Sequence, residues 1–158
     1  MAGATSPSQP CIFCQIARGS TSTPLLHADD KVVAFQDIKP SAFRHYLVIP
    51  VEHIPTVRDL QRRNEDYALV SHMLNVGQTL LRRDAPQSNQ YRFGFHQPPL
   101  NSVHHLHLHC LALPFIPRSH CLRLMVNLCL VHKRCKVYGL RRFLSASEIR
   151  SRISVLVT

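Results

Sequence analysis

Residues 104–113 read His-His-Leu-His-Leu-His-Cys-Leu-Ala-Leu, the most regular alternation of polar and apolar side chains in the sequence. Successive side chains of a β-strand point to opposite faces, so this alternation predicts a strand with one face of imidazoles and one face in the core. The three imidazoles are those of His105, His107 and His109. Desolvating several imidazoles without a task costs free energy, whereas an imidazole can act as nucleophile, acid–base catalyst or metal ligand near neutral pH. This strand is therefore the first candidate for a functional site.

The elements around this strand predict a mixed α and β domain. Residues 32–36 and 46–50 are short runs of strand-forming residues, and residues 91–96 form another run that Pro98-Pro99 ends. Over residues 59–83, apolar side chains recur every three to four positions, which is typical of an amphipathic helix. The order strand–strand–helix–strand–strand favours an α+β fold, an antiparallel sheet of about five strands with one main helix packed on it.

Length and composition favour a single globular domain. The chain has 158 residues, of which 45% are hydrophobic. No apolar run approaches the ~20 residues of a membrane-spanning helix, and residues 1–10 lack the pattern of a secretory signal. We therefore expect a cytoplasmic protein that also enters the nucleus, with its six cysteines as thiols or metal ligands. Residues 1–10 are expected to be a disordered N-terminus, and residues 11–114 the folded domain.

The net charge of +10 is concentrated in the last part of the chain. Residues 1–114 carry 10 basic and 8 acidic side chains, whereas residues 115–158 carry 9 basic side chains and 1 acidic one. Residues 115–158 therefore form a basic tail whose structure the pattern does not predict. Such a tail can bind nucleic-acid phosphates without sequence preference, although a solvated basic segment is more common.

Five segments in the same order resemble one protein family. His105-Leu-His-Leu-His-Cys-Leu111 resembles the His-x-His-x-His-x-x signature of the histidine triad superfamily of nucleotide hydrolases and transferases. The other matching segments are Cys11-x-x-Cys14 and residues 35–40, 45–53 and 91–99. The match covers residues 11–114 and points to the nucleotide-binding (Hint) branch, which implies a HIT-like α+β fold.

The resemblance implies an enzyme, an adenosine 5′-monophosphoramidase. His107 would be the nucleophile that attacks the α-phosphorus of an AMP–amine conjugate, such as AMP-lysine or an aminoacyl-adenylate. Expulsion of the amine would leave a histidyl–AMP intermediate, from which water releases AMP. One ring nitrogen of His107 must be free to attack, so we expect a backbone carbonyl to hold the other.

The resemblance also implies roles for neighbours of His107. His109 would place positive charge beside the phosphate oxygens, and Ser102 would donate a hydrogen bond to the phosphate or to the leaving group. His45 would support the triad by hydrogen bonding. Asp37 would accept the two ribose hydroxyls, although without the family a turn aspartate before Pro40 is the better explanation.

Two apolar residues, Ile38 and Phe13, are candidates for the wall of the adenine site. Packing in the core explains them equally well. Five further histidines receive no role: His27, His72, His104, His120 and His132.

Cys11-x-x-Cys14 by itself is a redox pair, half of a zinc site or a chance spacing. In metal-containing triad proteins the remaining ligands correspond to His53 and His105. The resemblance therefore implies a structural zinc ion with four protein ligands, which leaves no open position for water. The chemistry at His107 would itself require no cofactor.

The chain departs from the family pattern in three places, one of which is Pro99-Leu-Asn-Ser102, where many members have a glycine-rich loop. His96 stands where many members have an asparagine, and the chain has no tryptophan, although a C-terminal tryptophan helps to form the site or the homodimer in this branch.

Two alternative functions stay open beside the phosphoramidase. One is a catalytically weak module that binds nucleotides or nucleic acid, recruited through residues 115–158, and the other is a DNA deadenylase like aprataxin.

Overall fold

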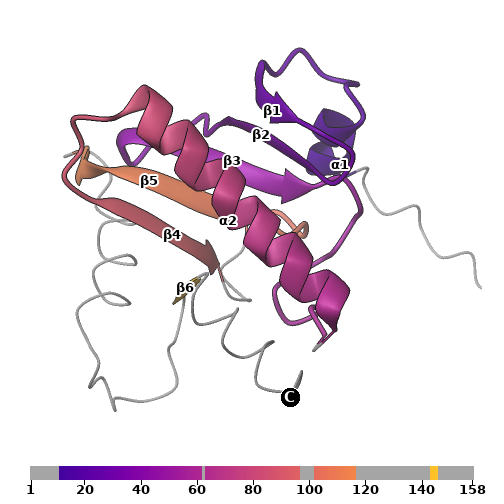
Figure 1. The fold of residues 1–158 in the computed structure, drawn as a ribbon. Helices are drawn as coiled ribbons and strands as arrows, with labels where there is room; N and C mark the ends of the chain where they lie inside the picture. The colour runs from indigo at the N-terminus through magenta and orange to yellow at the C-terminus, as the bar shows by residue number, and fades with distance from the viewer. Residues whose placement is uncertain (1–10, 62, 97–101, 117–142, 146–158) are drawn as a thin grey trace, which may run out of the picture.

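A computed structural model of the chain describes residues 11–61, 63–96, 102–116 and 143–145. The elements in chain order are α1 (Ile12–Ala17), β1 (Leu25–Ala28), β2 (Val32–Gln36), β3 (Ala42–Pro50), α2 (Asn64–Asp84), β4 (Tyr91–His96), β5 (Leu108–Phe115) and β6 (Phe143–Ser145). The strands form one antiparallel sheet in the order β1-β2-β3-β5-β4-β6, and α2 crosses the sheet (Figure 1). The expected α+β fold is thereby confirmed.

The two faces of the sheet carry separate cores, as strand alternation requires. On β3, Tyr46 and Val48 pack with buried side chains of α2, whereas Leu47 and Ile49 pack with Phe13 of α1. In the pairing of β3 with β5, Leu47 lies opposite His109. His109 therefore lies on the face of the sheet that α1 covers, opposite the face on which α2 packs.

Helix α2 is amphipathic, as its spacing predicts. Val70, Met73, Leu74 and Leu81 are buried against the sheet. Acidic side chains occupy the first turn and arginines the last, which suits the partial charges at the two helix ends. The helix begins at Asn64 and not near residue 59, because Asp59 Oδ2 accepts hydrogen bonds from the amide and hydroxyl of Thr56 in a local turn.

The strand expected over residues 104–113 begins later, at Leu108. The segment before it leaves the ladder, because the Leu106 amide donates to the carbonyl of Ile54, in the loop after β3 (2.6 Å). Alternation nevertheless continues through this segment. Leu106 joins the core on the α2 side, whereas His105 and His107 contact Phe13 on the other side.

The chain also forms elements that the sequence pattern did not predict. These are the six-residue helix α1, the edge strand β1 and the three-residue strand β6, which pairs with β4. The disorder expected for residues 1–10 lies outside the described residues, and so does most of the basic tail. Within the described part of the chain, no helix combines the length and apolar character needed to cross a membrane.

Candidate active site

The three histidines of the alternating stretch are buried on the α1 side of the sheet. His105 and His107 lie just before β5, and His109 lies on it; their exposed fractions are 1%, 6% and 5%. The ring of Phe13 packs edge-on against His105 and His107, with centroids 6.0 Å and 5.4 Å apart. The short helix α1 thus closes one side of the histidine group.

His107 has the hydrogen bond that leaves one ring nitrogen available. Its Nδ1–H donates to the carbonyl of His105 at 2.6 Å, the kind of acceptor expected from the sequence. In the neutral ring the proton therefore sits on Nδ1 and the lone pair on Nε2. Burial lowers the pKa of His107, so the neutral form predominates near pH 7. Such an imidazole can act as a nucleophile.

A chain of three further histidines runs beside His107, and its proton positions follow from one backbone amide. The Ser41 amide donates to Nδ1 of His45 (3.3 Å), so the proton of neutral His45 sits on Nε2. His45 Nε2–H donates to Nδ1 of His109 (2.8 Å), and His109 Nε2–H donates in turn to Nδ1 of His96 (3.0 Å). His96 thus belongs to the site, although the sequence pattern assigned it no role.

Burial keeps this histidine chain neutral. It lowers the pKa of His45 and of His96 to about 4, and that of His109 well below its ordinary value. The electric field of Asp37 opposes the shift at His45 without overcoming burial. The positive charge expected on His109 is therefore absent from the free protein, and His109 offers a neutral N–H donor.

The other expected site residues take different positions. Asp37 follows β2, its Oδ1 accepts the Lys39 amide (2.8 Å), and its Oδ2 lies 3.4 Å from Nε2 of His45. Ile38 beside it is 91% exposed, whereas Phe13 is buried. Ser102 lies on an exposed bend three residues before His105. Asp37 and Phe13 thus lie close to the histidines, and Ile38 is free to contact a ligand.

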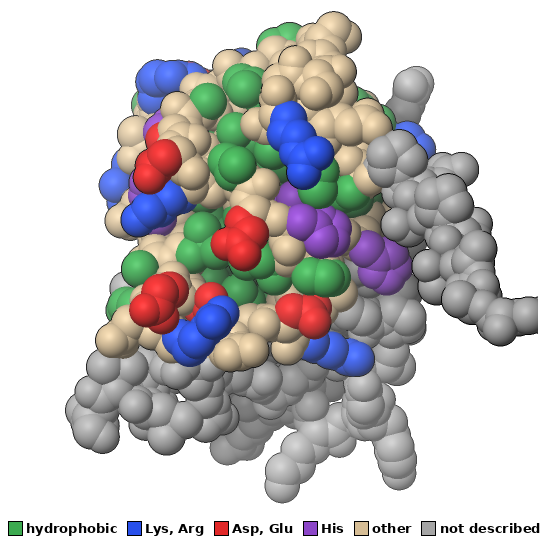
Figure 2. All heavy atoms as spheres, turned by 90° about the vertical axis from the view of Figure 1, so that its right-hand side faces the viewer, with side chains coloured by type: hydrophobic (Ala, Val, Ile, Leu, Met, Phe, Trp, Pro, Cys, Tyr) green, Lys and Arg blue, Asp and Glu red, His purple; other side chains and the backbone are tan. Residues whose placement is uncertain are grey.

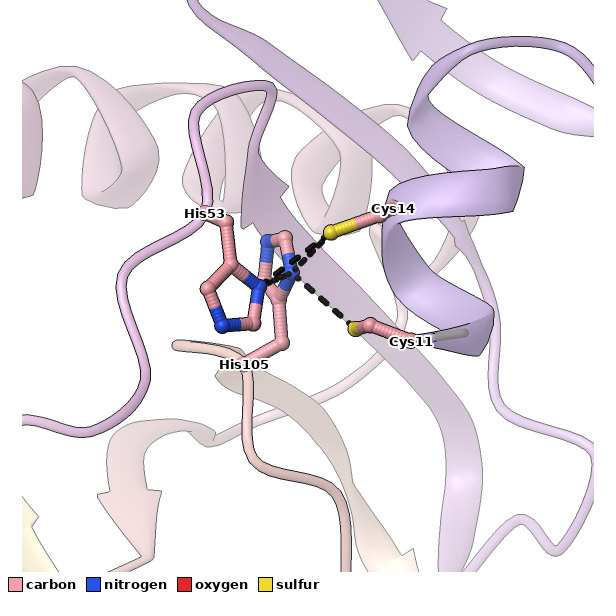
Figure 3. A group of neighbouring side chains, drawn as sticks. All are labelled: Cys11, Cys14, His53 and His105. Atoms are coloured by element: carbon pink, nitrogen blue, oxygen red, sulfur yellow. Dashed lines mark hydrogen bonds between the residues drawn. The ribbon is translucent and has the colours of Figure 1, made fainter. Parts of the chain in front are cut away.

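The four expected metal ligands converge from three separate segments (Figure 3). Nδ1 of His105 lies 3.5 Å from Sγ of both Cys11 and Cys14, and 3.2 Å from Nδ1 of His53. Sγ of Cys14 lies 3.2 Å from the same His53 nitrogen. A tetrahedral zinc ion with Zn–N of about 2.0–2.1 Å and Zn–S of about 2.3 Å would separate its ligands by ~3.3–3.8 Å, so the donor set fits.

The orientation of His105 supports the same interpretation. Its Nε2–H donates to the carbonyl of Pro50 (2.9 Å), so Nδ1 presents a lone pair to the two thiols. Fixing a ligand ring through its second nitrogen is a common device of histidine metal sites. Figure 2 shows one face of the molecule, on which acidic and basic side chains are interspersed and histidine side chains are exposed on both sides of the view.

Comparison with known families and sequences agrees with this geometry. Residues 10–121 match the family model described as scavenger mRNA decapping enzyme C-term binding. The chain is 73% identical over 111 residues to the Arabidopsis thaliana protein named bifunctional adenosine 5′-phosphosulfate phosphorylase/adenylylsulfatase HINT4, covering 70% of this chain and 75% of that one. It is 42% identical to the Xenopus tropicalis protein named adenosine 5′-monophosphoramidase HINT3, covering 70% of this chain and 76% of that one.

Solved structures with the same architecture include two bacterial proteins. A HIT family hydrolase from Legionella pneumophila aligns with a TM-score of 0.60 and 33% identity, over 65% of this chain and 91% of that one. A histidine triad protein from Clostridium difficile aligns with a TM-score of 0.62 and 30% identity, over 71% of this chain and 97% of that one.

Proposed function

The chain belongs to the histidine triad family, and from this premise we propose that it is a hydrolase of adenosine 5′-monophosphoramidates. The observation that carries the proposal is the His107 Nδ1–H bond to the carbonyl of His105, which leaves the Nε2 lone pair of a neutral imidazole for attack on phosphorus. Relatives named as phosphoramidases, including the purine nucleoside phosphoramidase of Escherichia coli, support the substrate class.

The reaction would proceed in two displacements at the α-phosphorus. His107 Nε2 forms a bond to phosphorus while the P–N bond of the substrate breaks, and the amine leaves with a proton. Water then attacks the phosphorus of the histidyl–AMP intermediate and gives up a proton, which balances the proton that the amine took up. AMP is released and the electron pair of the broken P–N bond returns to Nε2 of His107. The imidazole suits both steps because it is nucleophilic when neutral and leaves readily when it carries a proton.

His109 and Ser102 would serve the phosphate in this scheme. The Nε2–H of His109 is a neutral donor that can turn from His96 toward a phosphate oxygen. His45 would position His109 by donating to its Nδ1. Ser102, on its exposed bend, would donate to the phosphate or to the leaving group.

Three residues would hold the nucleoside. The lone pairs of Asp37 Oδ2 are suited to the ribose hydroxyls, because Oδ1 is already engaged by the Lys39 amide. The exposed side chain of Ile38 would cover the adenine, with Phe13 as part of the wall beneath.

A second leaving group, sulfate, is favoured by the relative named bifunctional adenosine 5′-phosphosulfate phosphorylase/adenylylsulfatase, which is 73% identical. The same attack by His107 on phosphorus would expel it. The two leaving groups differ in their need for a proton, because sulfate leaves as a stable anion whereas an amine must be protonated. Loss of a proton donor such as Ser102 should therefore slow amine release more than sulfate release.

We propose further that Cys11, Cys14, His53 and His105 hold a structural zinc ion. The convergence of two thiols and two imidazole nitrogens within 3.2–3.5 Å supports this assignment. Zinc would tie α1 to the loop after β3 and to the start of the triad. His105 would then be a ligand with no direct part in the chemistry, and the zinc would have no open position for substrate.

The assay that tests the function uses the purified full-length chain with AMP-lysine, adenosine 5′-phosphosulfate and adenylated DNA as alternative substrates. We expect AMP release from the first two, and loss of at least about a thousandfold in His107→Ala because the nucleophile is gone. The exposed neighbour variant His104→Ala is the matched control. Failure to release AMP from either nucleotide, or retained activity in His107→Ala, would contradict the proposal.

The alternative substrate, the nucleic-acid partner, the oligomeric state and the location in the cell are each tested by a separate measurement. AMP release from adenylated DNA alone would support the deadenylase alternative. Binding of DNA or RNA with a steep salt dependence would support a nucleic-acid partner for the basic tail. Sedimentation of the full chain would test whether it forms the homodimer of the branch without the C-terminal tryptophan, and imaging in cells would test the cytoplasmic and nuclear location.

A further inference from the structure

A second group of metal-ligating side chains lies on the α2 side of the sheet, away from the triad. His27 is on β1, Asp29 is in the turn that joins β1 to β2, and His72 is on α2. His27 pairs with Ala34, whose side chain belongs to the core beneath α2. These three residues are therefore distinct from the Cys11 cluster and from the histidines around His107.

The two imidazoles converge on a single oxygen atom. Nε2 of His27 and Nε2 of His72 each lie 2.7 Å from Oδ2 of Asp29. The other oxygen, Oδ1, accepts the backbone amides of Lys31 and Val32 at 2.9 Å and 2.8 Å. The carboxylate is thus held in one orientation by its own turn, as hydrogen bonds from neighbouring groups orient the ligands of metal sites.

The group is accessible, and no lysine or arginine among the described residues neutralises it. The side chains of His27, Asp29 and His72 are 34%, 25% and 38% exposed. Among the described residues, Asp29 forms ion pairs with these two histidines and with no lysine or arginine. A hydrated cation can therefore reach the three donor atoms without breaking a salt bridge to a basic side chain.

We propose that His27, Asp29 and His72 form a second metal site, one that takes a divalent transition-metal ion of the zinc, cobalt and nickel class. Two imidazole nitrogens and one carboxylate oxygen are the donor set these ions accept, with the remaining positions filled by water. Metal–ligand distances of about 2.0–2.2 Å place neighbouring donors ~3 Å apart, so each histidine needs to move outward by a few tenths of an ångström. In the metal-bound state each ring would present the lone pair of Nε2 to the ion and carry its proton on Nδ1.

The site would connect β1 and α2, two elements that are not hydrogen-bonded to each other in the sheet. β1 is the edge strand, and α2 lies over the sheet beside it. A bound ion would link the β1–β2 turn to the middle of α2. Unlike the four-ligand site at Cys11, it would keep water positions open and exchange its metal with solution.

The test is a calorimetric titration of Ni²⁺ into the full-length chain, prepared without a polyhistidine tag and loaded beforehand with one equivalent of zinc. We expect the wild-type chain to bind one Ni²⁺. In His72→Gln the amide can still donate to Asp29, but the imidazole ligand is lost, so the affinity should fall at least about tenfold. Asn75→Ala changes an exposed position of the same helix and should bind Ni²⁺ as the wild type does.

Thermal unfolding supplies the second measurement, because only binding to the folded chain raises the midpoint. Ni²⁺ should stabilise the wild type and Asn75→Ala but not His72→Gln. Two outcomes would overturn the proposal. The first is that the zinc-loaded wild type binds no Ni²⁺. The second is that His72→Gln binds Ni²⁺ with unchanged affinity, which would place the metal elsewhere in the chain. The three residues would then only form hydrogen bonds between β1, its turn and α2.

Discussion

At the scale of single residues, the proton positions around His109 explain how His45, His109 and His96 lie close together without mutual repulsion. The Ser41 amide assigns the proton of His45 to Nε2, and each following ring then donates to the next. Neutral rings in this order satisfy one another, whereas a second proton on any of them would face a neighbour's N–H. Burial lowers the pKa values accordingly.

Acid should therefore destabilise the fold through His45 and His96. Their pKa values of about 4 in the folded chain lie below the ordinary value of 6.5, so between these values the unfolded chain binds more protons than the folded one. The free energy of unfolding should fall as the pH decreases from about 6.5 toward 4. Each such group contributes a slope of up to about 1.4 kcal/mol per pH unit.

Urea unfolding of His96→Asn across this pH range checks the prediction. An asparagine side-chain oxygen can still accept a hydrogen bond from His109 Nε2–H but takes up no proton. The slope of the free energy of unfolding against pH should therefore decrease by the contribution of one titrating group. His104→Asn is the matched control for loss of a histidine at an exposed position. An unchanged slope in His96→Asn would show that this ring does not resist protonation in the folded state.

At the scale of elements, α2 lies close against β5 where Gly77 faces Cys110. A Cβ on Gly77 would overlap Sγ of Cys110, and it would lie 3.5 Å from Cε1 of Phe93 on β4. The glycine is required here by space, since its helix position carries no positive φ. The close approach seats α2 on the strand whose other face carries His109.

Gly77→Ala should destabilise the fold by about 1–3 kcal/mol through overpacking, as measured by chemical denaturation. The variant Gly77→Ala/Cys110→Ala removes the sulfur that the new methyl group meets, and should recover a large part of this loss. A cost for the double variant equal to the sum of the two single costs would show that Gly77 and Cys110 are not coupled.

At the scale of the whole molecule, the proposed zinc site connects parts of the chain that the sheet leaves separate. Helix α1 has six residues, too few to be stable alone, and its buried contacts come from Phe13 and Ile16. Cys11 and Cys14 would attach it to His53 and to His105, which lies 94 residues after Cys11 in the sequence. The same attachment would hold Phe13 against His107.

Removal of the metal should therefore lower the thermal unfolding midpoint. Cys14→Ser should lose one equivalent of zinc per chain by elemental analysis, and a chelator should destabilise the wild type more than this variant. Ser20→Ala, at an exposed position beyond α1, serves as the control. Equal zinc content in wild type and Cys14→Ser would contradict the assignment of the ligands.

Much of this organisation was predictable from local patterns. The pattern of apolar side chains that must be buried predicts the strands at residues 32–36 and 91–96 and the periodicity of α2. The segment around His105 was harder, because its alternation persists after its backbone has left the ladder to bond Ile54. Helix α1 has too short an apolar pattern to be recognised, and its stability comes from partners far along the chain.

The sequence by itself determined which side chains share a face, because alternation along a strand is a property of neighbouring residues. It therefore indicated the imidazole face at 105–109 and the covered face of α2. Only the tertiary structure decided which distant groups meet: His96 with His109, and His72 with Asp29. Those distances depend on strand order and on the packing of α2 across the sheet, which no local periodicity encodes.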